Sequence, residues 1–179
     1  MRIRQHCGLL AFASVFAILA FTKPVVAGAG NADVCENGMD SNLVIEACTP
    51  IIDAGGTRDL SLGLALDDRC SARNDIGQFD LALQDCETAI RLNADFARSY
   101  NNRGNAHAGK QEYRLAIADY DHAIRLDPNF EFAYYNRALA REALGDYAQA
   151  VEDYTAAIRA SPQDADNYMA RCHNYAILG

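Results

Sequence analysis

Apolar and small residues in the second half of the chain recur three or four positions apart, which is the spacing of residues on one face of an α-helix. Residues 116–124 carry one such stripe, made of two alanines, a tyrosine and an isoleucine, and residues 150–158 carry the same stripe 34 positions later. Glycine-containing pairs at 77–78 and 145–146 are typical of tight turns. The pattern predicts antiparallel helix pairs, each with an apolar face that a neighbouring pair must cover.

The stripes belong to a repeat of 34 residues. Three strings follow one another at this spacing with no insertion: "DCETAIRLNA" (85–94), "DYDHAIRLDP" (119–128) and "DYTAAIRASP" (153–162). A fixed period of this length indicates an array of stacked structural units. The three repeats and the partial repeat after them occupy, in order, residues 63–96, 97–130, 131–164 and 165–179.

This repeat resembles the tetratricopeptide repeat, in which a small residue in the first helix is followed by an alanine, a large ring, a second alanine and a closing proline. Residues 97–130 carry the pattern as Gly104, Ala116, Tyr120, Ala123 and Pro128. Residues 131–164 carry it as Ala138, Ala150, Tyr154, Ala157 and Pro162. In residues 63–96, Ala94 replaces the proline. The resemblance implies an all-α fold: a right-handed solenoid of antiparallel helix pairs with about three full repeats and a C-terminal half repeat.

Residues 28–62 precede the repeats and are predicted to form an N-terminal capping helical hairpin. The string "EACTPII" (46–52) is similar to "QDCETAI" (84–90), and Gly55-Gly56 is suited to end the second helix.

Residues 1–27 have the pattern of a secretory signal peptide. A start with two arginines is followed by an apolar run of about 15 residues and by small residues that end at Ala27. The run is shorter than the roughly 20 residues that a spanning helix needs, although an uncleaved membrane anchor is the alternative. The segment predicts an exported protein, periplasmic or secreted.

Export also predicts disulfides, because cysteines pair in oxidising compartments. In a hairpin that turns at residues 40–42, Cys35 and Cys48 lie opposite each other and are the first predicted pair. Cys70 and Cys86 lie about one helical turn out of register across the next hairpin and are the second predicted pair.

The alternative for the second pair is that both cysteines are packing residues, because they occupy the places of Gly104 and Tyr120. Loss of Cys7 with the signal segment leaves an odd number, so Cys172 is predicted to be a free thiol that packs as a small residue.

An arginine recurs next to the buried face of every repeat: Arg69, Arg103, Arg137 and Arg171. An unpaired buried charge would be costly, so a partner must recur with the same period. An aspartate does so: Asp85, Asp119 and Asp153. Pairs could form within a repeat or between repeats, and the register across the turns favours the second arrangement: Asp85–Arg103, Asp119–Arg137 and Asp153–Arg171. The alternative is that the arginines bind a ligand carboxylate, as in chaperone-binding members of the family.

The resemblance also implies a concave groove lined by the first helices of the repeats. Its candidate peptide-binding residues are Arg98, Asn101, Asn105, Phe132, Tyr135 and Leu139. Arg98 is the single cation at these places, which argues against a carboxylate clamp. The apolar residues form a candidate binding patch, and packing against the neighbouring repeat or the C-terminal segment is the alternative.

The net charge and the motifs of the sequence reduce the number of function classes that fit. Removal of residues 1–27 leaves 13 basic and 24 acidic residues, a net charge of −11, which disfavours nucleic acid. The common catalytic, phosphate-binding and zinc motifs are absent from the sequence. We therefore expect no enzyme, cofactor or metal site, but a scaffold that binds a protein or peptide, with self-association through the C-terminal face as a further option. The alternative is a secreted Sel1-like β-lactam hydrolase, which residues 97–164 do not favour because they contain no cysteine.

Overall fold

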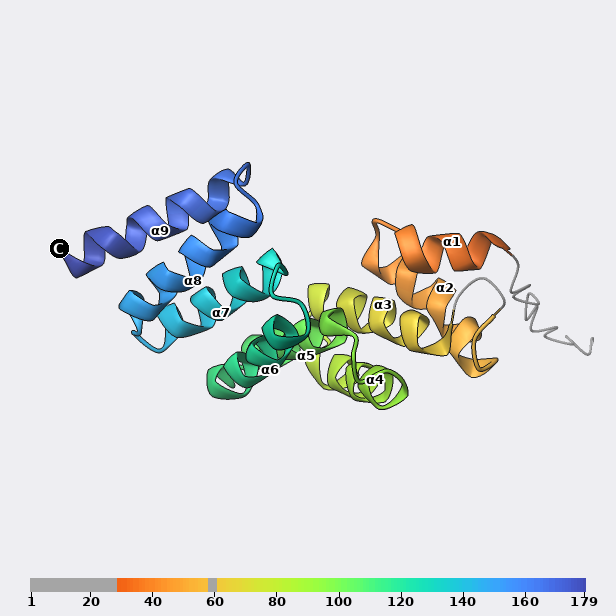
Figure 1. Cartoon of the computed structure of the whole chain (residues 1–179). Helices are drawn as coiled ribbons and strands as arrows, with labels where there is room; N and C mark the ends of the chain where they lie inside the picture. Colours follow the sequence, from red (N-terminus) through yellow and green to blue (C-terminus); the bar gives the residue numbers. More distant parts are fainter. Residues whose placement is uncertain (1–28, 58–60) are drawn as a thin grey trace, which may run out of the picture.

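The computed structural model describes residues 29–57 and 61–179. Within these ranges the chain forms nine α-helices and no strand (Figure 1). The helices are α1 (Ala29–Asn37), α2 (Ser41–Asp53), α3 (Leu62–Asp75), α4 (Phe79–Leu92), α5 (Ala97–Gly109), α6 (Tyr113–Leu126), α7 (Glu131–Ala143), α8 (Tyr147–Ala160) and α9 (Ala165–Leu178). The predicted signal peptide, residues 1–27, lies outside the described ranges. None of the helices in these ranges is both long and apolar enough to cross a bilayer.

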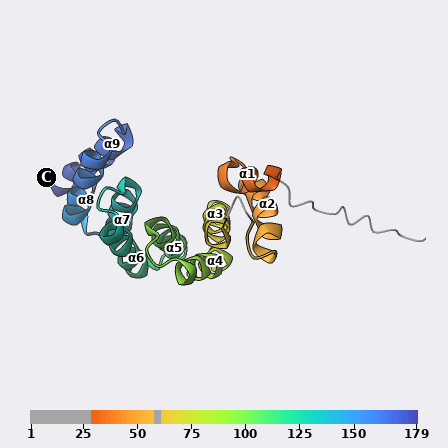
Figure 2. The same cartoon turned by 45° about the vertical axis from the view of Figure 1, so that its right-hand side comes forward.

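Successive helices pack in pairs: α1 with α2, α3 with α4, α5 with α6, and α7 with α8, while α9 follows as a first helix. The pairs form a curved row, in which α3 and α5 lie on the inner side and α4 and α6 on the outer side (Figure 2). First helices contact first helices, α1 with α3, α3 with α5 and α5 with α7. They form one inner surface, which we call the inner groove. The predicted all-α solenoid is confirmed.

Small residues in the first helices make room for large rings in the second helices. Tyr120 is almost fully buried, and a Cβ added to Gly104 would lie 2.6 Å from its ring. Tyr154 packs in the same way in a cluster with Ala138 and Ala150. The small residue and the ring therefore set the distance between the two helices of a pair, because a larger side chain at the first place would displace the ring.

The turns between paired helices use a left-handed residue at a fixed place. Gly77 and Gly145 have φ angles of 76° and 83°, and Gln111 adopts 63° at the equivalent place of the middle repeat. The next backbone N–H then bonds back to the end of the first helix, as Asp146 N does to Arg141 O at 2.9 Å. This is the Schellman pattern that ends many helices. The middle repeat makes the same turn with a residue that has a Cβ.

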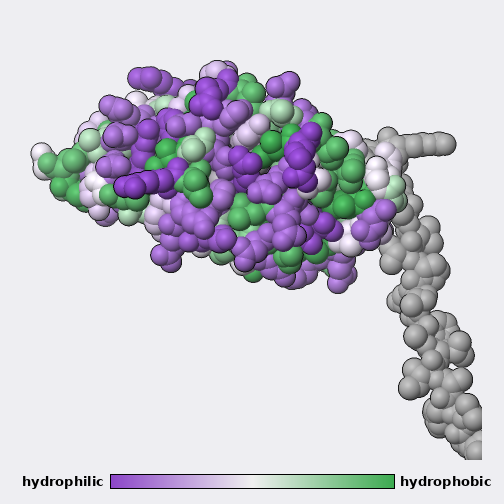
Figure 3. Space-filling view, turned by 90° about the horizontal axis from the view of Figure 1, so that it is seen from below, coloured by the Kyte–Doolittle hydropathy of each residue, from purple (hydrophilic) through white to green (hydrophobic). Residues whose placement is uncertain are grey.

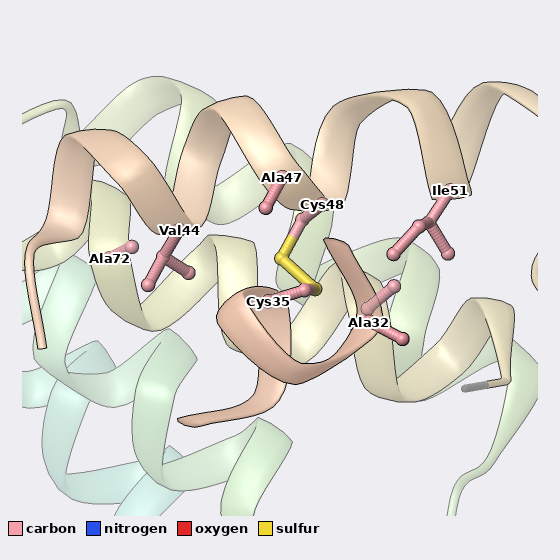
Figure 4. Packing of buried hydrophobic residues seen from close by; sticks show 8 residues of the cluster. Ala32, Cys35, Val44, Ala47, Cys48, Ile51 and Ala72 are labelled. Carbon is pink, nitrogen blue, oxygen red and sulfur yellow. A yellow bond between two sulfur atoms is a disulfide. The ribbon is translucent and has the colours of Figure 1, made fainter. Parts of the chain in front are cut away.

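Two disulfides staple the N-terminal half of the solenoid. Cys35 and Cys48 join α1 to α2 within a cluster of buried apolar residues (Figure 4). Cys70 and Cys86 join α3 to α4. Both predicted disulfides are confirmed. Cys172 is a free thiol, but it is exposed on α9, so its predicted packing role is wrong.

Candidate functional site

The recurring arginines pair inside their own helix pair. In the middle repeat, Arg103 donates from Nε and Nη2 to the two carboxylate oxygens of Asp119, at 2.9 and 2.5 Å. Three bidentate pairs form in this way: Arg69–Asp85, Arg103–Asp119 and Arg137–Asp153. The predicted between-repeat pairs are wrong, since none of these forms: Asp85–Arg103, Asp119–Arg137 and Asp153–Arg171. We call the three observed pairs the arginine ladder.

The register prediction failed because a guanidinium lies several bonds away from its Cα. A long side chain that runs along the helix can cover more than one 5.4 Å turn, so a pair whose Cα atoms are out of register still meets. The aspartates of the ladder are at most 6% exposed. A buried carboxylate without its partner would cost several kcal/mol, about 3–5 when a pair is broken. The ladder therefore holds the two helices of each repeat together.

The same arginines also reach the preceding helix pair, but through another residue. Arg137 donates from Nη1 to Asp121 on α6, two positions after the predicted partner. Arg171 donates from Nη1 to Thr155 on α8 at 3.4 Å, again two positions after the predicted partner. A contact between repeats therefore exists, but its acceptor is the residue two positions after the ladder aspartate.

A second cation supports the ladder and was not predicted. Arg73 and Arg141 each donate from Nη1 to the ladder aspartate of their own repeat, at 2.6 Å in both cases. His107 occupies this place in the middle repeat, where its Nδ1 lies 2.7 Å from Glu112 and its Nε2 lies 3.9 Å from Asp119. The 34-residue recurrence of Arg73, His107 and Arg141 in the sequence was the signal that could have revealed it.

The polar residues predicted for the inner groove bind other helices instead. Arg98 on α5 forms ion pairs with Asp67 and Asp68 on α3. Asn101 is buried and accepts a hydrogen bond from Asn136 Nδ2 on α7 at 3.0 Å, so its assignment as a ligand-binding residue is wrong. These contacts join successive first helices and leave Arg98 neutralised by two carboxylates.

Asn105 is likewise used inside its own repeat, since it accepts a hydrogen bond from the hydroxyl of Tyr120 at 2.9 Å. The sequence pattern could not show this bond, because the Tyr120 ring fills the place beside Gly104 and its hydroxyl reaches the next turn of α5.

The apolar candidates on α7 divide into two groups. Tyr135 is half-buried, and its ring meets the ring of Tyr154 edge to face, with centroids 5.7 Å apart. Phe132 and Leu139 lie on the same helix face and are 57% and 42% exposed. The Phe132 ring also meets the ring of Phe130 edge to face, but Phe132 and Leu139 stay exposed enough to contact a ligand. Tyr135 serves mainly the packing of its own repeat.

A pocket of about 230 Å³ opens where the capping hairpin meets the first repeat. It is lined by residues of α1, α2, α3 and α5 and by the turn between α1 and α2. We call it the acidic pocket, because Glu36, Asp68 and Asp75 line it and Arg98 is its single basic lining residue. The pKa of Asp68 is raised to about 6, chiefly by burial; the ion pair with Arg98 opposes this rise, and the charges of Asp67 and Glu36 contribute to it.

The described residues contain no group of three histidine, cysteine, aspartate or glutamate side chains that could hold a metal ion. The ion pairs of the ladder join helix to helix, and their arginines are mostly buried with their aspartates. The exposed apolar side chains of α7 and the lining of the acidic pocket are therefore candidates for contact with a ligand.

Comparisons with known proteins agree with this architecture. The sequence profile described as "Tetratricopeptide repeat" matches residues 97–130 and 132–164. Residues 97–130 and 132–164 thus match tetratricopeptide repeats, and the same arrangement of paired helices continues in two pairs on the N-terminal side and in α9 on the C-terminal side. A search of curated proteins found no match to the sequence.

Three solved structures illustrate the likeness. The tetratricopeptide domain of OM64 from Arabidopsis is 26% identical, with a TM-score of 0.61 over 64% of this chain and 94% of that chain. MamA is 23% identical, with a TM-score of 0.67 over 81% of this chain and 82% of that chain. The first tetratricopeptide domain of Spaghetti (RPAP3), bound to the HSP90 peptide SRMEEVD, is 21% identical, with a TM-score of 0.62 over 65% and 92%.

Proposed function

We propose that the protein is a non-catalytic interaction scaffold of the cell envelope, which binds a peptide or protein segment in its inner groove. The observation that carries the proposal is the exposed apolar pair Phe132 and Leu139 on α7, one of the first helices that line the groove. Met169, on the next first helix α9, is a further exposed apolar side chain, with 62% of its surface exposed. Apolar side chains that remain exposed in a concave surface are typical anchors for a bound segment.

The ligand chemistry differs from that of the HSP90 peptide bound by the RPAP3 domain, which ends in Glu-Glu-Val-Asp. Such an acidic end needs free cations in the groove, whereas Arg98 is already paired with Asp67 and Asp68. The ladder arginines are also paired. A scaffold with this groove therefore suits a segment with apolar anchors and without a cluster of acidic residues.

Partner capture tests the proposal. A tagged protein that lacks residues 1–27 is used as bait in an extract of the native host's envelope, beside a Phe132→Ala, Leu139→Ala variant. We expect the variant to lose the bound partner. Leu115→Ala is the matched control, because Leu115 is 54% exposed on the second helix α6 and its loss should leave capture intact. Equal capture by all three proteins would refute the groove as the binding surface.

The cell-envelope location is supported by the signal-peptide pattern of residues 1–27. Expression of the full chain, followed by fractionation and N-terminal sequencing, should give an exported protein that begins at Gly28. A chain that keeps its first 27 residues and stays in the membrane fraction would favour the anchor.

Self-association is a further proposal for the C-terminal face. Tyr175, Ile177 and Leu178 at the end of α9 are each about half exposed. Seen from below the view of Figure 1, much of the surface is hydrophilic, and hydrophobic residues are visible at the C-terminal tip as well as at the middle and the N-terminal side of this face (Figure 3). Sedimentation of the wild type beside an Ile177→Ser, Leu178→Ser variant should show a larger species only for the wild type.

A further inference from the structure

The acidic pocket combines two kinds of wall. Val44, Met39 and Ala72 supply apolar surface, and Glu36, Asp68 and Asp75 supply carboxylates. An aliphatic stem that ends in a positive charge fits such a pocket, because the stem can lie along the apolar wall while the charge meets the acids. Lysine and arginine side chains have this form. The pocket belongs to the inner groove, since α1, α3 and α5 line it.

One carboxylate oxygen of Asp68 in the pocket lacks a hydrogen-bond donor. Asp68 is 8% exposed, and its Oδ1 accepts a hydrogen bond from Arg98 Nη2 at 2.6 Å. Its Oδ2 is buried and has no hydrogen-bond partner. A buried carboxylate oxygen without a donor is costly, and most such atoms in folded proteins are satisfied. A donor brought by a ligand would remove this cost.

The charged residues around the pocket determine whether a cationic or an anionic ligand group is favoured. Arg98 is the one basic residue of the lining, and Asp67 and Asp68 both pair with it. Glu36 is exposed and Asp75 is exposed with a hydrogen bond from Ser41 Oγ at 3.1 Å, so both keep carboxylate oxygens for a ligand. The excess of carboxylates over guanidinium groups favours a cation over an anion.

We propose that the acidic pocket binds the basic side chain, lysine or arginine, of the partner segment. The proposal rests on the proposed function and names the chemistry of one position in its ligand. The aliphatic stem lies against Val44 and Met39, and the cationic head donates to Asp68 and Glu36. The capping hairpin thereby takes part in recognition, because residues of α1, of α2 and of the turn between them form half of the pocket lining.

Titration with small probes tests the pocket without knowledge of the partner. The isotope-labelled protein that lacks residues 1–27 is titrated with N-acetyl-arginine methylamide, and amide resonances are followed by NMR. N-acetyl-norleucine methylamide keeps an aliphatic stem without the charge, and N-acetyl-glutamate methylamide reverses the charge. We expect resonances of pocket residues to shift with the arginine probe, and both other probes to leave them unchanged.

Variants separate the pocket from the overall negative charge of the protein. Asp68→Asn and Glu36→Gln should each weaken binding of the arginine probe at least threefold, and the first variant keeps Asp67 as the partner of Arg98. Asp80→Asn is the matched control, because it removes one charge from a residue of α4 that does not line the pocket, and it should leave binding unchanged.

Three results would overturn the proposal. The norleucine and arginine probes could shift the same resonances equally, or no pocket resonance could shift at the highest soluble concentration. The third is that Asp80→Asn weakens binding as much as Asp68→Asn.

Failure of the pocket proposal is distinct from failure of the scaffold proposal. A partner that needs Phe132 and Leu139 but is captured equally by Asp68→Asn would leave the scaffold standing and remove the basic side chain from its ligand.

Discussion

Replacement of Asp153 by alanine should destabilise the C-terminal half of the solenoid. Asp153 is 3% exposed and accepts three hydrogen bonds from guanidinium groups: two from Arg137 and one from Arg141. Each such bond to a charged group contributes about 1.5–3 kcal/mol. Without the carboxylate, Arg137 keeps Asp121 as a partner, but Arg141 keeps only the carbonyl of Gln149. We expect the free energy of unfolding to fall by about 3–5 kcal/mol.

Urea unfolding followed by circular dichroism measures this loss. Asp80→Ala is the control, because Asp80 is 80% exposed and pairs with Lys110 at the surface, where an ion pair contributes little. The control should unfold with the wild-type midpoint. If Asp153→Ala also kept that midpoint, the ladder would carry no appreciable stability.

A double-mutant cycle then tests which arginine is the partner. Combined replacement of Asp153 and Arg137 by alanine should show a coupling free energy above about 1.5 kcal/mol, because the two groups share two hydrogen bonds. The cycle between Asp153 and Arg171 should show less than about 0.5 kcal/mol, as expected for residues without a shared contact. The opposite result would restore the between-repeat pairing and refute the geometry of the ladder.

Three further predictions concern single positions. The folded-state pKa of Asp68 is about 6, against 3.8 ordinarily, so the stability gained by its protonation is full below about pH 4 and is lost as the pH rises through 6. From about pH 4 to about pH 7, Asp68→Asn should therefore gain up to about 3 kcal/mol relative to the wild type in thermal unfolding, and a constant difference would contradict the shift. Gln111→Gly should raise the free energy of unfolding by about 0.5–1 kcal/mol in urea, since glycine adopts a φ of 63° without strain; an unchanged midpoint would show that the turn is relaxed. Replacement of both Cys70 and Cys86 by alanine should cost about 3 kcal/mol in the same assay, because the bond closes a loop of 16 positions, whereas Cys172→Ser should be neutral.

The sequence predicted the repeats and both disulfides because these depend on short-range periodicity. Paired helices of known length place Cys35 opposite Cys48 and leave Cys70 within reach of Cys86, whatever the side chains between them do. The helix pair also fixed where the small residue Gly104 must face a ring.

The partners of long or amphipathic side chains could not be predicted from Cα register alone. An arginine such as Arg137 can run along its helix in either direction, and the favourable partner depends on where the neighbouring carboxylates, here Asp121 and Asp153, end up after packing. Asn101 was misassigned for a related reason: a groove position in the motif is open only if the next repeat does not place a hydrogen-bonding side chain over it, and Asn136 does so. The acidic pocket arose from the cap, whose sequence departs from the repeat.

The two disulfides make the two ends of the solenoid differ in their resistance to unfolding. Both lie in the cap and the first repeat, while in residues 97–164 small residues and rings hold the paired helices together. In a stacked array each repeat is stabilised by its neighbours, so opening starts at the less constrained end. The oxidised chain should therefore unravel from α9 toward α5, and the stapled half that carries the acidic pocket should be the last part to open.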